Sequence, residues 1–227
     1  MILWNIYSYF YDTLNELIPY RNMIHEISNL LNTNKDSVIL DAGCGTGNLC
    51  KALLKPNRSV IGIDRCTPML KIARPKLNGQ AEIKEMDINK QLEFPSNMFD
   101  GAALINVLYV VEEPERVLKE IYRVLKPSGT LVLVNPVPNI NTNNAFYEHC
   151  KLSHFNMFKN LKLILKLSIV GAINFLISIK GKKKNYHFIS QENLSKMLQN
   201  QGFEVVSSKI TYADECYMFV ARKQEIV

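Results

Sequence analysis

The stretch VILDAGCGTGN, from Val38 to Asn48, decides the fold of this chain. It begins as a short apolar run that ends in the carboxylate of Asp41, which is typical of a buried parallel strand. Glycines then follow at alternate positions, Gly43, Gly45 and Gly47. They predict a tight turn into a helix, because glycine tolerates positive φ and lets the backbone approach a ligand closely. Such a ligand would lie at the carboxyl edge of the sheet, where open α/β folds bind their ligands.

Three nucleotide-like ligands compete for this loop. A P-loop requires a lysine after its last glycine, and no lysine follows Gly47 at that spacing. A dinucleotide loop has the pattern GxGxxG, and Asn48 occupies the position of its third glycine. S-adenosylmethionine carries no phosphate, and its ammonium group and ribose suit a loop headed by the carboxylate of Asp41. A second apolar run supports this reading, since it ends in Asp64, about where α/β nucleotide sites bind ribose hydroxyls.

With these motifs in order, residues 38–136 resemble a class I S-adenosylmethionine-dependent methyltransferase. The resemblance implies that Met69 lies against the adenine, that Asp87 and Ile88 read the adenine edge, and that Asn106 contacts the methionine end. The cofactor-binding residues expected in this way are Asp41, Gly43, Cys44, Gly45, Asp64, Arg65, Met69, Asp87, Ile88, Asn106 and Tyr11. Ser128 stands where family members often carry a glycine, which is a mild departure.

Strands and helices alternate from Ser37 to Val134, and this predicts an α/β fold with a doubly wound sheet and helices on both faces. The resemblance extends the sheet to seven mostly parallel strands, of which the last two form an antiparallel hairpin. We expect one methyltransferase domain made of a helical arm (1–34), a cofactor-binding core (35–136), a lid or substrate insert (137–188) and a C-terminal helix with strands (189–227). Within the arm, Pro19 should separate two helices.

The composition is that of an ordinary globular enzyme, with 227 residues, 47% hydrophobic and 21% charged. Five cysteines without a C-x-x-C pair predict a reduced, cytoplasmic protein and no metal site. The first residues lack the basic and apolar regions of a signal peptide. The net charge of +6 is local: residues 149–191 carry eight lysines and no acid, and the rest of the chain has fewer basic than acidic residues.

The insert is apolar on nearly every helical face from Leu161 to Ile179, and we expect a lid of two helices broken near Gly171. Its uncharged part is too short to span a bilayer, which takes about 20 residues. Two interpretations stay open. The lid either completes the core, or it lines a pocket for a lipophilic acceptor while Lys180–Lys184 face anionic headgroups in a peripheral membrane contact.

The resemblance implies attack of an acceptor on the sulfonium methyl of the cofactor. A general base is needed only for a hydroxyl or acidic carbon, and His149, His154 and His187 are candidates, although a packed or surface histidine is the more common case. Tyr109 is expected to line the acceptor pocket. Asn106–Tyr109 lacks the prolines of amino-group nucleic-acid methyltransferases, which disfavours nucleic acid.

The expected function is methyl transfer to a hydrophobic or amphipathic small molecule, either a quinone- or lipid-like acceptor or a secondary metabolite. Tyr11-Asp12 resembles the Tyr-Asp of quinone C-methyltransferases and of some phospholipid N-methyltransferases, and favours the first group. One alternative is a non-catalytic partner protein that binds the cofactor. Another is a nicotinamide oxidoreductase, which the spacing of the glycines disfavours.

Overall fold

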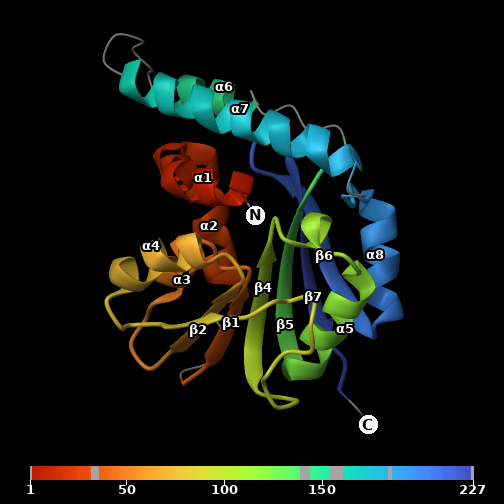
Figure 1. Ribbon diagram of the computed structural model, residues 1–227. Coiled ribbons are helices and arrows are strands. Elements are labelled where there is room, and N and C mark those ends of the chain that lie inside the picture. Colours follow the sequence, from red (N-terminus) through yellow and green to blue (C-terminus); the bar gives the residue numbers. More distant parts are fainter. Residues whose placement is uncertain (1, 32–35, 139–143, 154–160, 184–185, 226–227) are drawn as a thin grey trace.

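The computed structural model describes residues 2–31, 36–138, 144–153, 161–183 and 186–225 (Figure 1). A seven-stranded sheet with the order β3-β2-β1-β4-β5-β7-β6 forms its centre. The strands are β1 Val38–Ala42, β2 Ser59–Asp64, β3 Glu82–Glu85, β4 Phe99–Ile105, β5 Leu125–Pro136, β6 Phe203–Thr211 and β7 Cys216–Lys223. The first five strands pair in parallel, and β7 is antiparallel to both β5 and β6. This confirms the fold class expected from the sequence.

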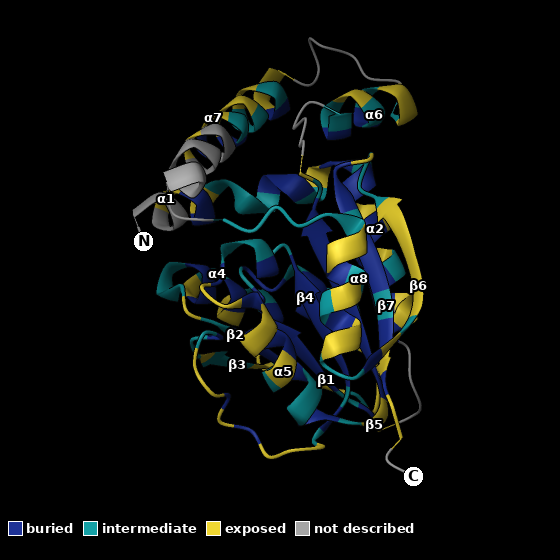
Figure 2. Cartoon of the chain, turned by 90° about the vertical axis from the view of Figure 1, so that its right-hand side faces the viewer, coloured by how far each residue is buried: buried dark blue, intermediate teal, exposed yellow. Residues whose placement is uncertain are grey.

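Helices cover both faces of the sheet, because each face of a parallel sheet is apolar and must be buried. One apolar cluster contains side chains of α2 (Ile18–Leu30), α3 (Asn48–Leu53) and α4 (Thr67–Leu77). The second contains side chains of α5 (Pro114–Val124) and α8 (Gln191–Asn200). Figure 2 shows the sheet as the buried centre, with exposed residues concentrated on the outer sides of the helices and on β6 at the sheet edge.

The arm differs from the prediction in where it breaks. It forms α1 (Ile2–Tyr11), the short 3-10 helix η1 (Asp12–Glu16) and then α2. Pro19 lies in the first turn of α2 rather than between the helices. The first turn accepts proline because its N–H groups have no intrahelical partner and the fixed φ suits a helix, so Pro19 starts the helix that it was expected to end.

The insert forms α6 (Asn144–Leu152) and α7 (Leu161–Lys183), and α7 runs across the end of the molecule above α1 (Figure 1). The expected break at Gly171 is wrong, because α7 is one continuous helix. A glycine inside a helix costs only about 1 kcal/mol relative to alanine, which weakens a helix without ending it. Just after the insert, Ser190 accepts a hydrogen bond from the Asn193 N–H at 3.3 Å and caps α8.

Candidate functional site

The glycine loop joins β1 to α3 in a backbone shape that only glycine adopts without strain. Gly43, Gly45 and Gly47 have φ values of 83°, 53° and 78°. A Cβ at Gly43 would lie 2.2 Å from Cγ2 of Val107, and one at Gly47 would lie 3.0 Å from Cδ1 of Leu77. The loop is therefore pressed against α4 and the segment that follows β4, and cannot retreat from a ligand.

Asp64 ties the loops after β1 and β2 together. Its Oδ2 accepts from the Gly45 N–H at 2.9 Å and its Oδ1 from the Cys66 N–H at 2.8 Å. Burial raises the pKa of Asp64, and these hydrogen bonds partly oppose that shift. A carboxylate at the carboxyl end of β2 beside a glycine turn is the arrangement that binds ribose hydroxyls in nucleotide sites. This carboxylate fits S-adenosylmethionine, because the ribose hydroxyls of the cofactor need a hydrogen-bond acceptor.

Asp41 lies beneath the loop and is 2% exposed. The Cys50 thiol donates to its Oδ2 at 3.2 Å. Burial raises the pKa of Asp41 to about 7, with a smaller contribution from the nearby charge of Asp64. Without a cationic partner this carboxyl is therefore partly protonated at neutral pH, and the positive charge of a bound cofactor would favour its ionised form.

The residues expected at the adenine end lie on the segments that follow β2 and β3. Met69 is 3% exposed on α4, and Ile88 is 8% exposed. Asp87 accepts from the backbone N–H of Asn89 at 3.0 Å and its side-chain amide at 2.9 Å, and lies 3.8 Å from Arg65. Burial alone would raise the pKa of Asp87, but these hydrogen bonds and the Arg65 charge hold it below its ordinary value. Asp87 is therefore an ionised acceptor.

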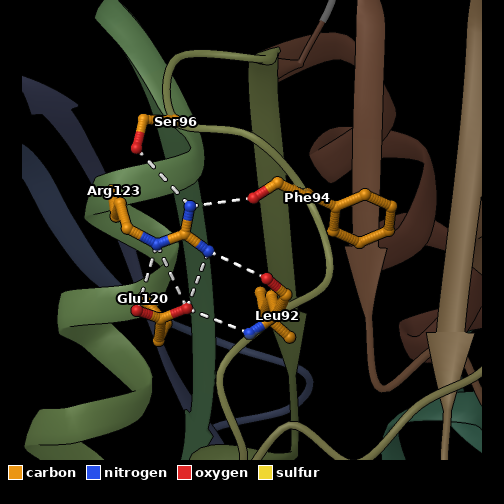
Figure 3. A network of polar contacts seen from close by, with 5 residues as sticks. All are labelled: Leu92, Phe94, Ser96, Glu120 and Arg123. Atoms are coloured by element: carbon orange, nitrogen blue, oxygen red, sulfur yellow. Dashed lines mark hydrogen bonds and ion pairs between the residues drawn. The ribbon is translucent and has the colours of Figure 1, made fainter.

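An arginine network holds the chain just beyond Asp87 and Ile88 (Figure 3). The Arg123 guanidinium donates to the carbonyls of Leu92 at 3.0 Å and Phe94 at 2.8 Å. It also pairs with Glu120, which accepts from the Leu92 N–H at 3.0 Å. These bonds fasten a segment that has no sheet partner, so they indirectly support the adenine end. Nothing in the local sequence indicated this role, because Arg123 and Leu92 are far apart in the chain.

The arm is fastened to the glycine loop through Asp12. Its Oδ1 accepts from the Thr46 hydroxyl at 2.7 Å and from Nζ of Lys76 at 2.8 Å. This places Tyr11 over the loop, where its ring is the nearest group to a Cβ built at Gly45, at 4.0 Å. Asp12 was noted in the sequence only as part of a motif, and the structure shows it as the link between arm and core.

Tyrosines from separate segments gather beside Tyr11. The rings of Tyr7 and Tyr11 meet edge to face at 5.3 Å, and Tyr20 meets Tyr212 at 6.0 Å. Burial is the main cause that raises the pKa of Tyr11 and Tyr212, and it raises the pKa of Tyr20 to about 12. These phenols are therefore protonated at neutral pH and act as hydrogen-bond donors, not as bases.

Tyr109 lies on the short helix η2 (Leu108–Val110) after β4. Its ring packs against Tyr186 and Phe188, each at 5.7 Å, and its carbonyl accepts from the His187 N–H at 2.8 Å. Burial raises the pKa of Tyr109 strongly. The residues that follow α7 thus close over the carboxyl end of β4.

Two asparagines mark the carboxyl ends of β4 and β5. Asn106 has a φ of 53° and its Oδ1 accepts from the Cys216 thiol at 3.6 Å. Asn135 is fully buried, and neither atom of its amide has a hydrogen-bond partner among the described residues. A buried amide without a partner costs about 1–3 kcal/mol, so Asn135 is a candidate for binding a ligand that enters this end of the sheet.

The candidate histidines are placed differently. His149 on α6 is 7% exposed, and its Nδ1 accepts from the Ile18 N–H at 3.4 Å, at the start of α2. Burial lowers the pKa of His149, as does the nearby charge of Arg21. These contacts give His149 a role in packing the insert on the arm. His154 and Lys184 lie outside the described residues.

A glycine turn after the first strand, a ribose-type acid at the end of the second and an acid just after the third define the class of protein. This is a nucleotide-type α/β fold arranged for S-adenosylmethionine. The model of the family described as "Methyltransferase domain" matches residues 40–133. The chain is 32% identical over 207 residues to a demethylmenaquinone methyltransferase of Lactobacillus johnsonii, covering 86% of this chain and 81% of the relative. It therefore belongs to the class I S-adenosylmethionine-dependent methyltransferases, and S-adenosylmethionine is its cofactor.

The chain is also similar to a second quinone methyltransferase and to solved structures with the same fold. A ubiquinone/menaquinone biosynthesis C-methyltransferase of Wigglesworthia glossinidia brevipalpis is 26% identical, over 96% of this chain and 90% of the relative. Among solved structures, a SAM-dependent methyltransferase from Aquifex aeolicus has a TM-score of 0.63 at 16% identity, covering 93% of both chains. The [4+2]-cyclase SpnF has a TM-score of 0.65 at 17% identity, covering 90% of this chain and 81% of its own. The fold alone thus does not fix a reaction.

Proposed function

We propose that this enzyme transfers a methyl group from S-adenosylmethionine to a carbon of a lipophilic hydroquinone. The observation that carries the proposal is a group of buried and half-buried rings beside the glycine loop. Tyr7 and Tyr11 come from the arm, and Tyr109 and Tyr186 come from the segments that follow β4 and α7. Aromatic walls with a few polar groups suit a flat apolar acceptor. The names of the relatives that span most of this chain support the same substrate class.

The cofactor, when bound, supplies a methyl group on a positively charged sulfur, which is already activated as an electrophile. In the proposed site, Asp64 and the glycine loop hold the ribose, while Met69, Asp87 and Ile88 receive the adenine. Asp41 and Asn106 lie at the methionine end. The cofactor half thus comes from the segment between Asp41 and Asn106, and the acceptor half combines the arm and the insert with Tyr109 and Asn135.

The acceptor residues act mainly by orientation. Tyr109 stays protonated because burial raises its pKa, so we assign it as a hydrogen-bond donor to an acceptor oxygen rather than as a base. Asn135 supplies a second polar group, since its buried amide is otherwise unpartnered among the described residues. The carbon–carbon bond forms as the carbon–sulfur bond breaks, and the proton of the hydroquinone leaves to water. Holding the reactants in line can account for about 7–11 kcal/mol of the barrier.

The test is a methyl-transfer assay with a demethylmenaquinone-type hydroquinone of short side chain, followed by mass spectrometry of the product. We expect a mass gain of one methylene on the ring and an equal amount of S-adenosylhomocysteine. Asp64→Ala should abolish turnover and weaken S-adenosylhomocysteine binding, whereas exposed Tyr147→Phe should change neither. Methyl transfer to a phospholipid or an amphipathic metabolite, but not to the hydroquinone, would contradict the proposal and favour the other acceptors that the sequence left open.

We also propose a cytoplasmic protein, because its five cysteines are free thiols, as expected in a reducing compartment. The peripheral membrane contact expected of Lys180–Lys184 stays a prediction, because the side chains of this run lie outside the described residues.

A further inference from the structure

The helix α7 is apolar on two opposite sides, and only one side is covered by protein. Its inner side contains Leu163, Val170 and Ile173, which are 7%, 4% and 5% exposed. Val170 and Ile173 belong to the same apolar cluster as Tyr7, and Leu167 and Tyr11 pack against that cluster. The inner side therefore roofs the acceptor half of the site.

The outer side of α7 carries an apolar stripe, which we define as Leu161, Leu165, Ile169 and Leu176. These side chains are 57%, 59%, 40% and 46% exposed. At 3.6 residues per turn they fall within an arc of about 100°. A run of large exposed aliphatic side chains along one helix is unusual for a protein surface that faces water. Figure 2 shows the exposed residues on the outer side of α7, away from the body of the molecule.

Charge indicates what covers this stripe. The sequence of α7 contains five lysines and no acidic residue. Lys162 is exposed beside the stripe, and Lys166 is half-exposed and pairs with Glu16 at 3.0 Å. A helix with apolar residues along one side and lysines beside them is the pattern of helices that lie in a membrane interface and attract anionic lipids. Of the described helices, none is long and apolar enough to cross a bilayer.

We propose that the outer side of α7 docks the protein on an anionic lipid bilayer, with the apolar stripe among the lipid chains and Lys162 at the headgroups. The site then faces the membrane, because the inner side of the same helix covers the tyrosines. A lipophilic acceptor passes from the bilayer to the site along the ends of α7 without crossing water. This route for the acceptor rests on the proposed function; the docking itself rests only on α7.

The experiment is flotation of the full-length protein with vesicles of phosphatidylcholine alone or with 30% phosphatidylglycerol, a composition chosen for the assay. We expect binding to the anionic vesicles only, and a loss of about tenfold or more in the partition coefficient for the double variant Leu161→Glu, Leu165→Glu. The matched control is Val206→Glu on β6, a residue 48% exposed at the sheet edge, which should bind like the wild type. For charge, Lys162→Glu should weaken binding and Lys119→Glu on α5 should not.

Other outcomes overturn the docking proposal. It fails if the wild type binds neither kind of vesicle, binds both equally, or binds them unchanged in the double variant. It also fails if light scattering shows a dimer that the double variant dissociates, since a second copy would then cover the stripe. Circular dichroism and thermal unfolding confirm that the variants are folded.

A separate assay distinguishes the two proposals. With a short-chain hydroquinone in solution, the double variant should keep wild-type kcat/KM, and with a long-chain hydroquinone in anionic vesicles it should lose about tenfold. Vesicle binding without methylation of either hydroquinone would contradict the proposed acceptor and leave the docking standing. Methylation of the soluble acceptor without vesicle binding would leave the acceptor standing and remove the docking.

Discussion

Asp64 finds its hydrogen-bond partners, Gly45 and Cys66, in the two loops that follow adjacent strands β1 and β2. Tyr109 instead meets Tyr186, which follows α7 and reaches the site from the far end of the insert. The cofactor half of the site is therefore built from short contiguous motifs at neighbouring strand ends, and the acceptor half from side chains that only the complete fold brings together. The difference predicts that changes to the backbone harm the cofactor half more than the acceptor half. It also predicts that single side chains determine how the acceptor half binds its substrate.

The strongest test of the cofactor half is Gly43→Ala. The new Cβ would lie 2.2 Å from Val107 at a φ of 83°, so either the segment that follows β4 or the glycine loop must move. We expect a loss of about 3–4 kcal/mol in the free energy of unfolding and no measurable S-adenosylhomocysteine binding. Urea unfolding and calorimetric titration provide the two measurements.

The control is Gly79→Ala in the turn after α4. Gly79 also has a positive φ, 74°, but nothing lies within 4 Å of its Cβ position. It should lose only about 1 kcal/mol, the cost of the left-handed backbone, and bind the ligand normally. Equal losses in the two variants would show that backbone strain, and not contact with Val107, sets the requirement for glycine.

The second prediction concerns pH, through Asp41. Its folded-state pKa of about 7 lies above the ordinary value of 3.8, so the folded protein holds a proton that the unfolded chain releases between these values. The free energy of unfolding of the ligand-free protein should therefore fall as pH rises from about 4 to 7, by an order of 2 kcal/mol relative to Asp41→Asn.

The measurement is urea unfolding of wild type and Asp41→Asn across this pH range. Parallel curves for the two proteins would rule out the raised pKa as a source of pH dependence. Saturating S-adenosylhomocysteine should flatten the difference, because its ammonium group favours the ionised carboxyl.

These contrasts explain what the sequence could and could not predict. The strand ends at Asp41 and Asp64 could be located because each acid follows an apolar run, and the doubly wound sheet follows from the alternation of strands and helices. Asp87 could be located only through the family resemblance, since the residues before it include three charged side chains. The link from Asp12 to Thr46 and Lys76 and the anchoring of Leu92 by Arg123 could not, since they join residues with no shared local pattern. The break expected at Gly171 overstated the effect of one glycine on a helix that packing holds together.

The third prediction tests the acceptor half with Tyr109→Phe. The ring contacts with Tyr186 and Phe188 should survive, and only the hydroxyl donor is lost. We expect kcat/KM for the hydroquinone to fall about tenfold, the value of one hydrogen bond, while the Kd for S-adenosylhomocysteine stays unchanged. The control is Tyr147→Phe, whose ring is 73% exposed on α6. An equal loss of cofactor affinity would place Tyr109 in the cofactor half instead.

The smallest expected effect belongs to Gly171→Ala, which tests the continuity of the helix that roofs the acceptor half. Nothing lies within 4 Å of the Cβ position of Gly171, and α7 is regular on both sides of it. Alanine should therefore raise the free energy of unfolding by about 0.5–1 kcal/mol without altering kcat/KM. Thermal and urea unfolding measure the gain. If alanine instead lowers kcat/KM for the hydroquinone while stabilising the protein, bending of α7 at Gly171 is part of acceptor entry, and the two-helix lid expected from the sequence describes a state that the enzyme uses.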